Sequence, residues 1–259
     1  MTPAEIAVGV AIGLASGILS GLFGVGGGIV MTPGIQVLLG APPIVALATP
    51  LPAILPTALA GALTYHRRDE VDLRAAAWLT PPGLVGAALG AWATEWIDTT
   101  WLLLVTAVLI GYQAIAIVRR AGRPEVSWEG SAPGLTFASI GAIAGFVSGL
   151  LGIGGGIVIV PLLAGRLGMP LKRALGTSLV AIVALVIPGT IVHAVLGHID
   201  VAIFLAIVVG AVPGARLGAG IALGTGERTL RMLVGAFLLV VAAAYAAEQL
   251  SSLLGSGSS

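Results

Sequence analysis

Long stretches of apolar residues, each bounded by charged residues or by Pro and Gly, dominate the chain from end to end. They fall at residues 5–22, 28–40, 43–64, 75–97, 100–118, 133–151, 155–166, 172–196, 201–224 and 229–248. Several have the roughly 20 residues that a helix needs to cross a hydrocarbon core about 30 Å thick. The stretches at 28–40 and 155–166 are too short to cross, so the pattern predicts half-helices there.

These stretches form two copies of one pattern. Residues 17–33 read GILSGLFGVGGGIVMTP and residues 145–161 read GFVSGLLGIGGGIVIVP, with 11 of 17 positions identical. The offset of 128 residues then continues without a gap through Gly40/Gly168, Pro42/Pro170, Thr49/Thr177, Gly61/Gly189, Asp72/Asp200, Gly86/Gly214 and Gly90/Gly218. Chance similarity between apolar helices would not keep one register over such a length, so the chain is an internal duplication.

One long polar segment, RRAGRPEVSWEGSAPG at 119–134, lies between the copies and marks the boundary. The organisation expected from it is a first membrane repeat at 1–118, a linker at 119–132, a second repeat at 133–250 and a flexible tail at 251–259. No Lys or Arg precedes the first apolar stretch, so that stretch is read as a membrane segment rather than as a signal peptide.

The composition excludes a soluble protein. Of the 259 residues, 58% are hydrophobic and 9% are charged, whereas a soluble domain carries about 25% charged residues. The 39 glycines fit helices that pack closely in a membrane. The absence of cysteine excludes disulfides, iron–sulfur ligation and thiol catalysis. No basic cluster indicates a nucleic-acid partner, and no motif indicates a cofactor.

The positions of Lys and Arg distinguish two topologies. If each opening pair of stretches re-enters on its own side, each copy crosses the membrane three times and the copies are inverted. With the linker in the cytoplasm, the basic residues of the loops then all face inside: Arg67, Arg68, Arg74, Arg119, Arg120, Arg123, Arg166, Lys172, Arg173, Arg228 and Arg231. Parallel copies, the alternative, would place the last five of these outside, against the positive-inside rule.

The predicted fold is therefore an all-α integral membrane protein with two inverted-topology repeats. Each repeat has a Gly-broken re-entrant helix pair followed by three transmembrane helices. Both termini are expected on the outer side of the membrane, and the linker in the cytoplasm.

GVGGG at 24–28 and GIGGG at 152–156 separate each long opening helix from its short partner. Glycine costs about 1 kcal/mol per residue in a helix relative to alanine, and unwound backbone at membrane depth persists only inside protein or beside a wet cavity. Each short helix would start there with free N–H groups and roughly +0.5 charge. Two inverted copies would bring two such ends together, which suits a small anion; close helix packing is the alternative explanation. The candidate anion-binding glycines are Gly24, Gly26, Gly27, Gly28, Gly152, Gly154, Gly155 and Gly156.

Hydroxyl side chains near the breaks are candidates for orienting the anion. They are the matched pairs Ser20/Ser148 and Thr49/Thr177, together with Ser178. Their alternative fate is a hydrogen bond to the preceding helical turn. Arg216 lies within a predicted span and would either attract the anion or extend toward the cytoplasmic face. The three histidines lack ligand spacing, so no metal site is predicted, and no Asp or Glu falls in the middle of a span.

At the motifs SGLFGVGGGIVMTP and SGLLGIGGGIVIVP, and at the GTS of residues 176–178, the chain resembles the TauE/SafE family of sulfite and organosulfonate exporters. The likeness covers nearly the whole chain. It implies export, or sometimes uptake, of small sulfur-containing anions such as sulfite or sulfoacetate across the bacterial inner membrane. The first copy reads Ala48-Thr49-Pro50 where the second reads GTS, so the two copies are not expected to contribute equally.

These observations predict a secondary transporter that moves a small sulfur-containing anion by alternating access, and not an enzyme. An anion channel and a transporter of small carboxylates are the alternatives. An intramembrane enzyme would need a nucleophile with a base or a metal triad, and a structural subunit would leave the duplicated breaks unexplained. The expected partners are the lipid bilayer and the anion; a coupling ion (H+ or Na+) and a homo-oligomeric state are left open.

Overall fold

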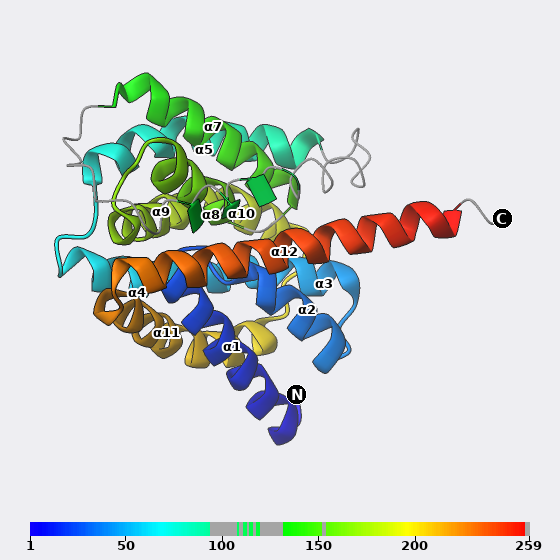
Figure 1. Ribbon diagram of the computed structural model, residues 1–259. Helices are drawn as coiled ribbons and strands as arrows, with labels where there is room; N and C mark the ends of the chain where they lie inside the picture. The colour runs from blue at the N-terminus through cyan, green and yellow to red at the C-terminus, as the bar shows by residue number, and fades with distance from the viewer. Residues whose placement is uncertain are drawn as a thin grey trace.

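The computed structural model describes residues 1–93, 132–151 and 154–256, with a few helical residues between 94 and 131. Within these residues the chain is helical and contains no strand. The helices, shown in Figure 1, are α1 (Pro3–Phe23), α2 (Gly28–Leu38), α3 (Pro43–Ala48), α4 (Pro50–His66), α5 (Leu73–Ala93), α7 (Gly134–Leu151), α8 (Gly156–Val160), the π-helical η1 (Pro161–Arg166), α9 (Leu171–Leu185), α10 (Ile187–Val195), α11 (Val201–Gly224) and α12 (Glu227–Ser256). Most of the stretch expected at 100–118, and nearly all of the linker expected at 119–132, fall outside the described residues.

Two expected helices are each divided in the structure. The stretch at 43–64 separates into α3 and α4 at Thr49, and the stretch at 172–196 separates into α9 and α10 at Val186. Each new helix has a proline in its first turn, Pro50 in α4 and Pro188 in α10. The missing N–H group of proline is tolerated at that position. The last helix, α12, is longer than expected and continues past the predicted start of the tail.

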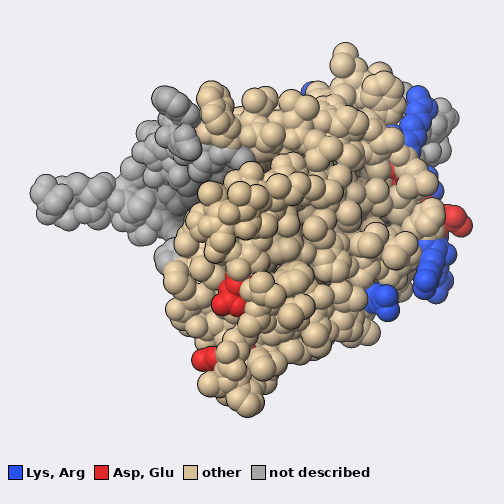
Figure 2. Space-filling view, turned by 180° about the vertical axis from the view of Figure 1, so that it is seen from behind, with Lys and Arg blue, Asp and Glu red and all other residues tan. Residues whose placement is uncertain are grey.

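Four helical segments of the described chain are long and apolar enough to cross a membrane: Pro3–Phe23, Ile44–His66, Leu171–Val195 and Val201–Gly224. The shorter α2, and α8 with η1, match the half-helices that the sequence predicts. Large apolar side chains such as Val195, 82% exposed, point outward, as they do in a protein whose solvent is lipid. Figure 2 shows the Lys and Arg side chains gathered toward one end of the molecule.

The matched aspartates of the two copies are helix N-caps. The Asp72 carboxylate accepts a hydrogen bond from the N–H of Ala75 (2.9 Å) at the start of α5. The Asp200 carboxylate accepts from the N–H groups of Ala202 (2.9 Å) and Ile203 (3.0 Å) at the start of α11. Each aspartate thus satisfies N–H groups that have no partner within the helix.

The two copies pack crosswise. Helix α1 lies along α11, and α5 lies along α7 (Figure 1). Under the 128-residue offset α1 corresponds to α7 and α5 to α11, so these two contacts are equivalent. Each copy therefore packs its opening helix on a long helix of the other copy. Helix α4 contacts α9 between the two pairs, and residues 50–57 of α4 are equivalent to residues 178–185 of α9.

Glycines make the crosswise contacts close. A Cβ atom on Gly13, Gly17 or Gly21 of α1 would collide with the backbone carbonyl of Ile207, Ala211 or Ala215 of α11, respectively. The glycines of α11 face the backbone of α1 in the same way: Gly210, Gly214 and Gly218. In a membrane such small-residue faces allow the van der Waals contact that holds helices together. Together with the eight glycines of the two break motifs, these six make up 14 of the 39 glycines.

We expect Gly17→Ala to destabilise the folded protein. The added methyl group has no free space against the Ala211 carbonyl, so α1 and α11 must move apart, at a cost of about 1–3 kcal/mol or more. Thermal unfolding of the detergent-purified protein would measure the effect. Gly220→Ala on α11 is the matched control, because nothing lies within 4 Å of its added Cβ. An unchanged melting temperature for Gly17→Ala would contradict the close α1–α11 contact.

Candidate functional site

The chain breaks between α1 and α2 because of its glycine backbone. Gly24, Gly26 and Gly27 have φ angles of 67°, 83° and 86°, in the left-handed region that only glycine adopts without strain. In the second copy Gly154 and Gly155 have matching φ angles of 84° and 77°. Gly152, a predicted anion-binding residue and the counterpart of Gly24, lies outside the described residues. The GxGGG motifs therefore encode a helix end followed at once by a new helix start.

Helix α2 starts with unused backbone donors. Its N-cap residue, Gly27, offers no side-chain cap, and its carbonyl accepts from the N–H groups of Val30 and Met31, both at 3.1 Å. The N–H groups of Gly28 and Ile29 have no acceptor among the described residues. A helix start of this kind favours an anion, because its N–H groups and dipole both present positive charge.

The second copy repeats this arrangement at Gly155, whose carbonyl accepts from the N–H groups of Val158 and Ile159, again at 3.1 Å. Gly155 is the N-cap of α8 and likewise offers no side-chain cap. Helix α8 is short and turns into η1 at Pro161, where the missing N–H group interrupts the α-helical bonds. The start of the second half-helix thus matches the first, although its continuation differs.

Ser20 lies directly against the start of α2. Its side chain is 0% exposed, and its hydroxyl has no hydrogen-bond partner. A Cβ on Gly27 would lie 3.4 Å from the Cβ of Ser20. Ser16, one turn earlier and equally buried, donates instead to the carbonyl of Gly13 (2.9 Å). Ser20 therefore forgoes the usual hydrogen bond to its own helix at the place where α2 presents its free N–H groups.

Ser148 occupies the equivalent place in the second copy. A Cβ on Gly155 would lie 3.3 Å from the Cβ of Ser148 and 3.1 Å from the carbonyl oxygen of Ala144, which is the counterpart of Ser16. The Ser148 side chain is 5% exposed. The two sites thus share one geometry, and Ser20 is the more enclosed of the two serines.

The two breaks meet. A Cβ on Gly156 would collide with the carbonyl oxygen of Gly24 and lie 2.7 Å from the Cα of Val25. The positive start of α8 therefore faces the negative end of α1. The sequence predicted two positive helix ends near each other, but the structure adds a carbonyl-bearing helix end beside one of them. Much of the positive potential of α8 is offset there, so the start of α2 is the better anion site.

Side chains from other helices satisfy the last carbonyls of α1. The Tyr65 hydroxyl of α4 donates to the carbonyl of Gly21 (2.9 Å). The Ser178 hydroxyl of α9 lies within 2.9 Å of the carbonyl of Gly24 and 2.8 Å of that of Leu175, and donates to one of them at a time. Ser178 was a predicted anion contact, and here it caps the end of a helix. Tyr65 was not predicted, because its matched position holds His193 and the repeat gives no signal for it.

The matched threonines link the two copies. Thr49 Oγ1 accepts from the N–H of Asp200 (3.1 Å), and Thr177 Oγ1 accepts from the N–H of Asp72 (2.9 Å). Each threonine thus bonds to the aspartate N-cap of the other copy, and both threonines are fully buried. The structure gives both threonines a contact between the copies, and the anion contact that the sequence predicts for them stays a prediction.

Arg216 is not brought to the breaks. It lies on α11 with its side chain exposed. The end of α11 is eight residues further along the chain, or about 12 Å at 1.5 Å per residue. A long arginine side chain on a lipid-facing surface extends toward the nearer interface. The exposed position of Arg216 is compatible with extension of its side chain toward the cytoplasmic face, the alternative to attraction of the anion.

His193 and His198, which lack metal-ligand spacing in the sequence, are neighbours in space. His193 Nδ1 lies 3.2 Å from His198 Nδ1, so one ring donates to the other. The five-residue spacing places them at the end of α10 and in the loop that follows. No group of three His, Cys, Asp or Glu side chains is positioned to hold a metal ion in the described parts of the chain.

The long apolar helices, the crosswise duplication and the discontinuous helices define the chain as a polytopic helical membrane protein of the transporter class. Its family follows from the match of residues 9–245 to the model of the family described as "Sulfite exporter TauE/SafE". The chain belongs to this family of membrane transporters.

Curated relatives agree with this assignment. The chain is similar to "Probable membrane transporter protein YunE" of Bacillus subtilis (strain 168), 27% identical over 85% of this chain and 89% of the relative. A "Probable membrane transporter protein" of Xylella fastidiosa (strain Temecula1 / ATCC 700964) is 29% identical over 93% of this chain and 95% of the relative. No solved structure matches the chain.

Thr177→Val should lower stability while leaving anion binding intact. The substitution keeps the shape of the side chain but leaves the N–H of Asp72 without its acceptor, at a cost of about 1 kcal/mol. Thermal unfolding with and without sulfite would separate the two effects. Thr64→Val is the control, because that hydroxyl bonds only within its own helix, to the carbonyl of Ala60. Lost anion binding at unchanged stability would restore Thr177 as an anion contact.

Proposed function

We propose that this protein is a secondary transporter that moves a small sulfur-containing anion, sulfite or an organosulfonate such as sulfoacetate, across the bacterial inner membrane. In this proposal the anion sits near the membrane midplane against the starts of the discontinuous helices α2 and α8. The family description supports the sulfur anion. The printed names of the relatives support a membrane transporter and do not name a substrate.

The unpartnered Ser20 hydroxyl is the observation that carries the proposal. Leaving a buried polar group without a hydrogen bond costs about 1–3 kcal/mol, yet Ser20 lies one turn from backbone acceptors of its own helix. An anion oxygen at the start of α2 would accept from this hydroxyl and from the N–H groups of Gly28 and Ile29. A sulfite or sulfonate head offers several such oxygens to converging donors.

The charge of the surroundings also suits an anion. The buried polar side chains in the described chain are all hydroxyls: Ser16, Ser20, Thr49, Thr57, Ser148, Thr177 and Ser178. Among the described residues no Asp, Glu, Lys or Arg is fully buried, although the Nε atom of the partly buried Arg173 is shielded. A buried carboxylate that would repel an anion is thus absent from this part of the chain. Binding through backbone dipoles at discontinuous helices is a recurring solution in secondary transporters.

Alternating access would come from movement of one copy against the other about the crosswise contacts. The reciprocal packing of α1 on α11 and of α7 on α5 supports two structurally equivalent halves. The gathering of basic side chains at one end (Figure 2) supports inverted copies, with that end in the cytoplasm and both termini outside.

We expect Ser20→Ala to weaken anion binding about 10-fold or more without destabilising the protein. Removing a buried, unsatisfied hydroxyl should leave the melting temperature unchanged or slightly higher, whereas the anion loses one of its donors. The measurements are thermal stabilisation by sulfite in detergent and sulfite uptake into proteoliposomes. We expect the stabilisation to shrink and the uptake to fall about 10-fold or more, in line with the loss of a hydrogen bond to a charged group.

Ser16→Ala is the matched control for this experiment. Ser16 lies on the same helix, is equally buried and already has its own hydrogen bond to Gly13. Its substitution should cost some stability and leave sulfite binding unchanged. If Ser20→Ala binds and transports sulfite like the wild type, the anion does not sit at the start of α2.

Single cysteines at matched loop positions test the inverted topology. The native chain has no cysteine, and Arg68 and Leu196 are both exposed and 128 residues apart. In right-side-out vesicles we expect a membrane-impermeant maleimide to label Leu196→Cys directly and Arg68→Cys only after permeabilisation. Labelling of both from the same side would rule out inverted copies.

A further inference from the structure

The same two isoleucines touch both helix breaks. Ile54 on α4 and Ile182 on α9 are matched by the 128-residue offset, and both are fully buried. A Cβ on Gly26 would lie 3.3 Å from Cγ2 of Ile54 and 3.2 Å from Cγ2 of Ile182. A Cβ on Gly154 would lie 3.8 Å from Cδ1 of Ile54 and 3.4 Å from Cγ2 of Ile182. The two side chains therefore stand where the two copies meet.

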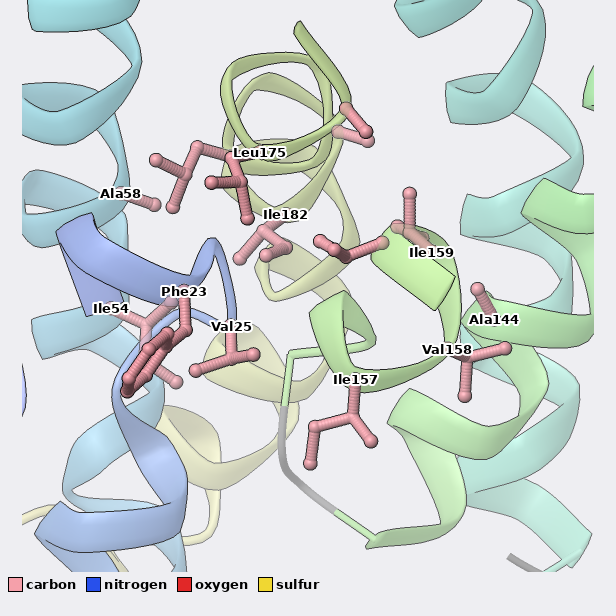
Figure 3. Packing of buried hydrophobic residues seen from close by; sticks show 14 of the residues in the cluster. Phe23, Val25, Ile54, Ala58, Ala144, Ile157, Val158, Ile159, Leu175 and Ile182 are labelled. Atoms are coloured by element: carbon pink, nitrogen blue, oxygen red, sulfur yellow. The ribbon is translucent and has the colours of Figure 1, made fainter. Parts of the chain in front are cut away.

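Their neighbours are aliphatic too. Val25 and Ile157, one from each break, are buried in the same cluster (Figure 3). An added Cβ on Gly156 would lie 2.8 Å from Cδ1 of Ile182, so this side chain reaches the start of α8 as well. Apart from the helix ends and the hydroxyls, the surroundings of the breaks offer hydrocarbon.

This lining restricts the part of a ligand that carries no negative charge. In this proposal, the remaining atoms of an anion held at the start of α2 face the isoleucines beside Gly26, two residues before that start. A methyl or methylene group is compatible with that contact, whereas an ammonium group would be buried without a counter-charge, at a high cost in free energy. Isoleucine is branched at Cβ and has few χ1 rotamers, so a change of rotamer at Ile54 or Ile182 does not readily make room for a longer ligand.

We propose that Ile54 and Ile182 set the size and chemical limit of the transported anion. The site accepts a compact anion with one charged head and a short apolar remainder, so of the two anions named above it favours sulfite over sulfoacetate, whose carboxylate would face the isoleucines. It also excludes longer and zwitterionic sulfonates. This inference rests on the proposed anion site at the helix breaks. It assigns to that site a pair of specificity-determining residues that bear no polar group.

A homologous series of ligands separates length from charge. The probes are sulfite, methanesulfonate, ethanesulfonate, propanesulfonate and taurine, each tested by thermal stabilisation and by competition with sulfite uptake into proteoliposomes. Propanesulfonate and taurine are of nearly equal size and differ in a methyl against an ammonium group. The variants are Ile54→Ala, Ile182→Ala and their combination, with the Val substitutions as milder versions that preserve the fold.

Ile207→Ala is the matched control. Ile207 is fully buried on α11, where its backbone faces Gly13. Ile207 is not among the nearest neighbours of the glycines at either break, and Gly13 precedes Ser20 by seven residues, about 10 Å along α1. This substitution therefore opens a space of the same size in the helix bundle without removing a contact that Ile54 or Ile182 makes at the breaks.

In the wild type we expect affinity to fall as the alkyl chain lengthens. In the Ala variants the affinity for propanesulfonate should rise about 10-fold or more, the usual effect of one or more methylene groups in an apolar site. Taurine should gain far less, because its ammonium group remains unpaired. The Val variants should show a smaller gain of the same sign, and Ile207→Ala should keep the wild-type profile.

Four results would overturn the inference. A folded Ala or Val variant whose affinities across the series match the wild type would exclude a size limit at these residues. A gain in propanesulfonate affinity in Ile207→Ala as large as in Ile54→Ala or Ile182→Ala would exclude it too. An equal gain for taurine and propanesulfonate would exclude the limit on charge. If the wild type binds no member of the series, sulfite included, the anion site itself is wrong and the size limit falls with it. If the wild type binds sulfite, only the role of the isoleucines is in question.

Discussion

The structure depends on one constraint: backbone polar groups released by a helix break inside a bilayer need partners from the protein, because lipid supplies none. The break after α1 releases carbonyls that would otherwise accept within the helix. The N–H of Gly24 bonds to the carbonyl of Ser20 (2.8 Å), and hydroxyls of Tyr65 and Ser178 bond to two more carbonyls. These partners come from α4 and α9, so the break fixes three helices relative to one another. The donors left over, at the start of α2, are those proposed to bind the anion.

Because the chain is duplicated, the same helix break and the same packing occur twice and join the two copies. The opening helix of each copy packs on a long helix of the other copy. The hydroxyl oxygen of each matched threonine accepts a hydrogen bond from the backbone N–H of the other copy's aspartate. Neither copy therefore completes its own packing, and the breaks lie where the copies meet. A displacement of one copy must change the surroundings of both breaks at once, which is the property that alternating access requires. The copies are not identical, since Tyr65 caps α1 while its counterpart His193 pairs with His198.

Lipid as solvent explains how the helices are held. Lipid chains are as apolar as leucine, so apolar burial gives little driving force between helices, and close van der Waals contact replaces it. The glycine faces of α1 and α11 supply that contact by bringing backbone against backbone. Large aliphatic residues are then free to face outward, and the few buried polar groups are hydroxyls that fit into small spaces.

The sequence by itself determined the membrane class, the duplication, the positions of both breaks and most helices of the described residues, but not the divisions at Thr49 and Val186. These features depend on local properties: hydropathy sets which stretches lie in lipid, and consecutive glycines cannot continue a helix whatever surrounds them. The pairs Ser20/Ser148 and Asp72/Asp200 were visible as matched positions for the same reason, although the capping role of the aspartates was not.

Tertiary structure alone decided what each matched residue contacts. Thr49 and Thr177 bond across the copies and Ser178 caps α1, because hydrogen-bond partners far apart in sequence are set by helix packing. Helix packing also leaves Arg216 exposed on α11. Ile54 and Ile182 read as ordinary core residues in the sequence, since an apolar side chain carries no chemical signal of its place. Only the meeting of α4 and α9 between the two breaks brings both isoleucines against the same glycines.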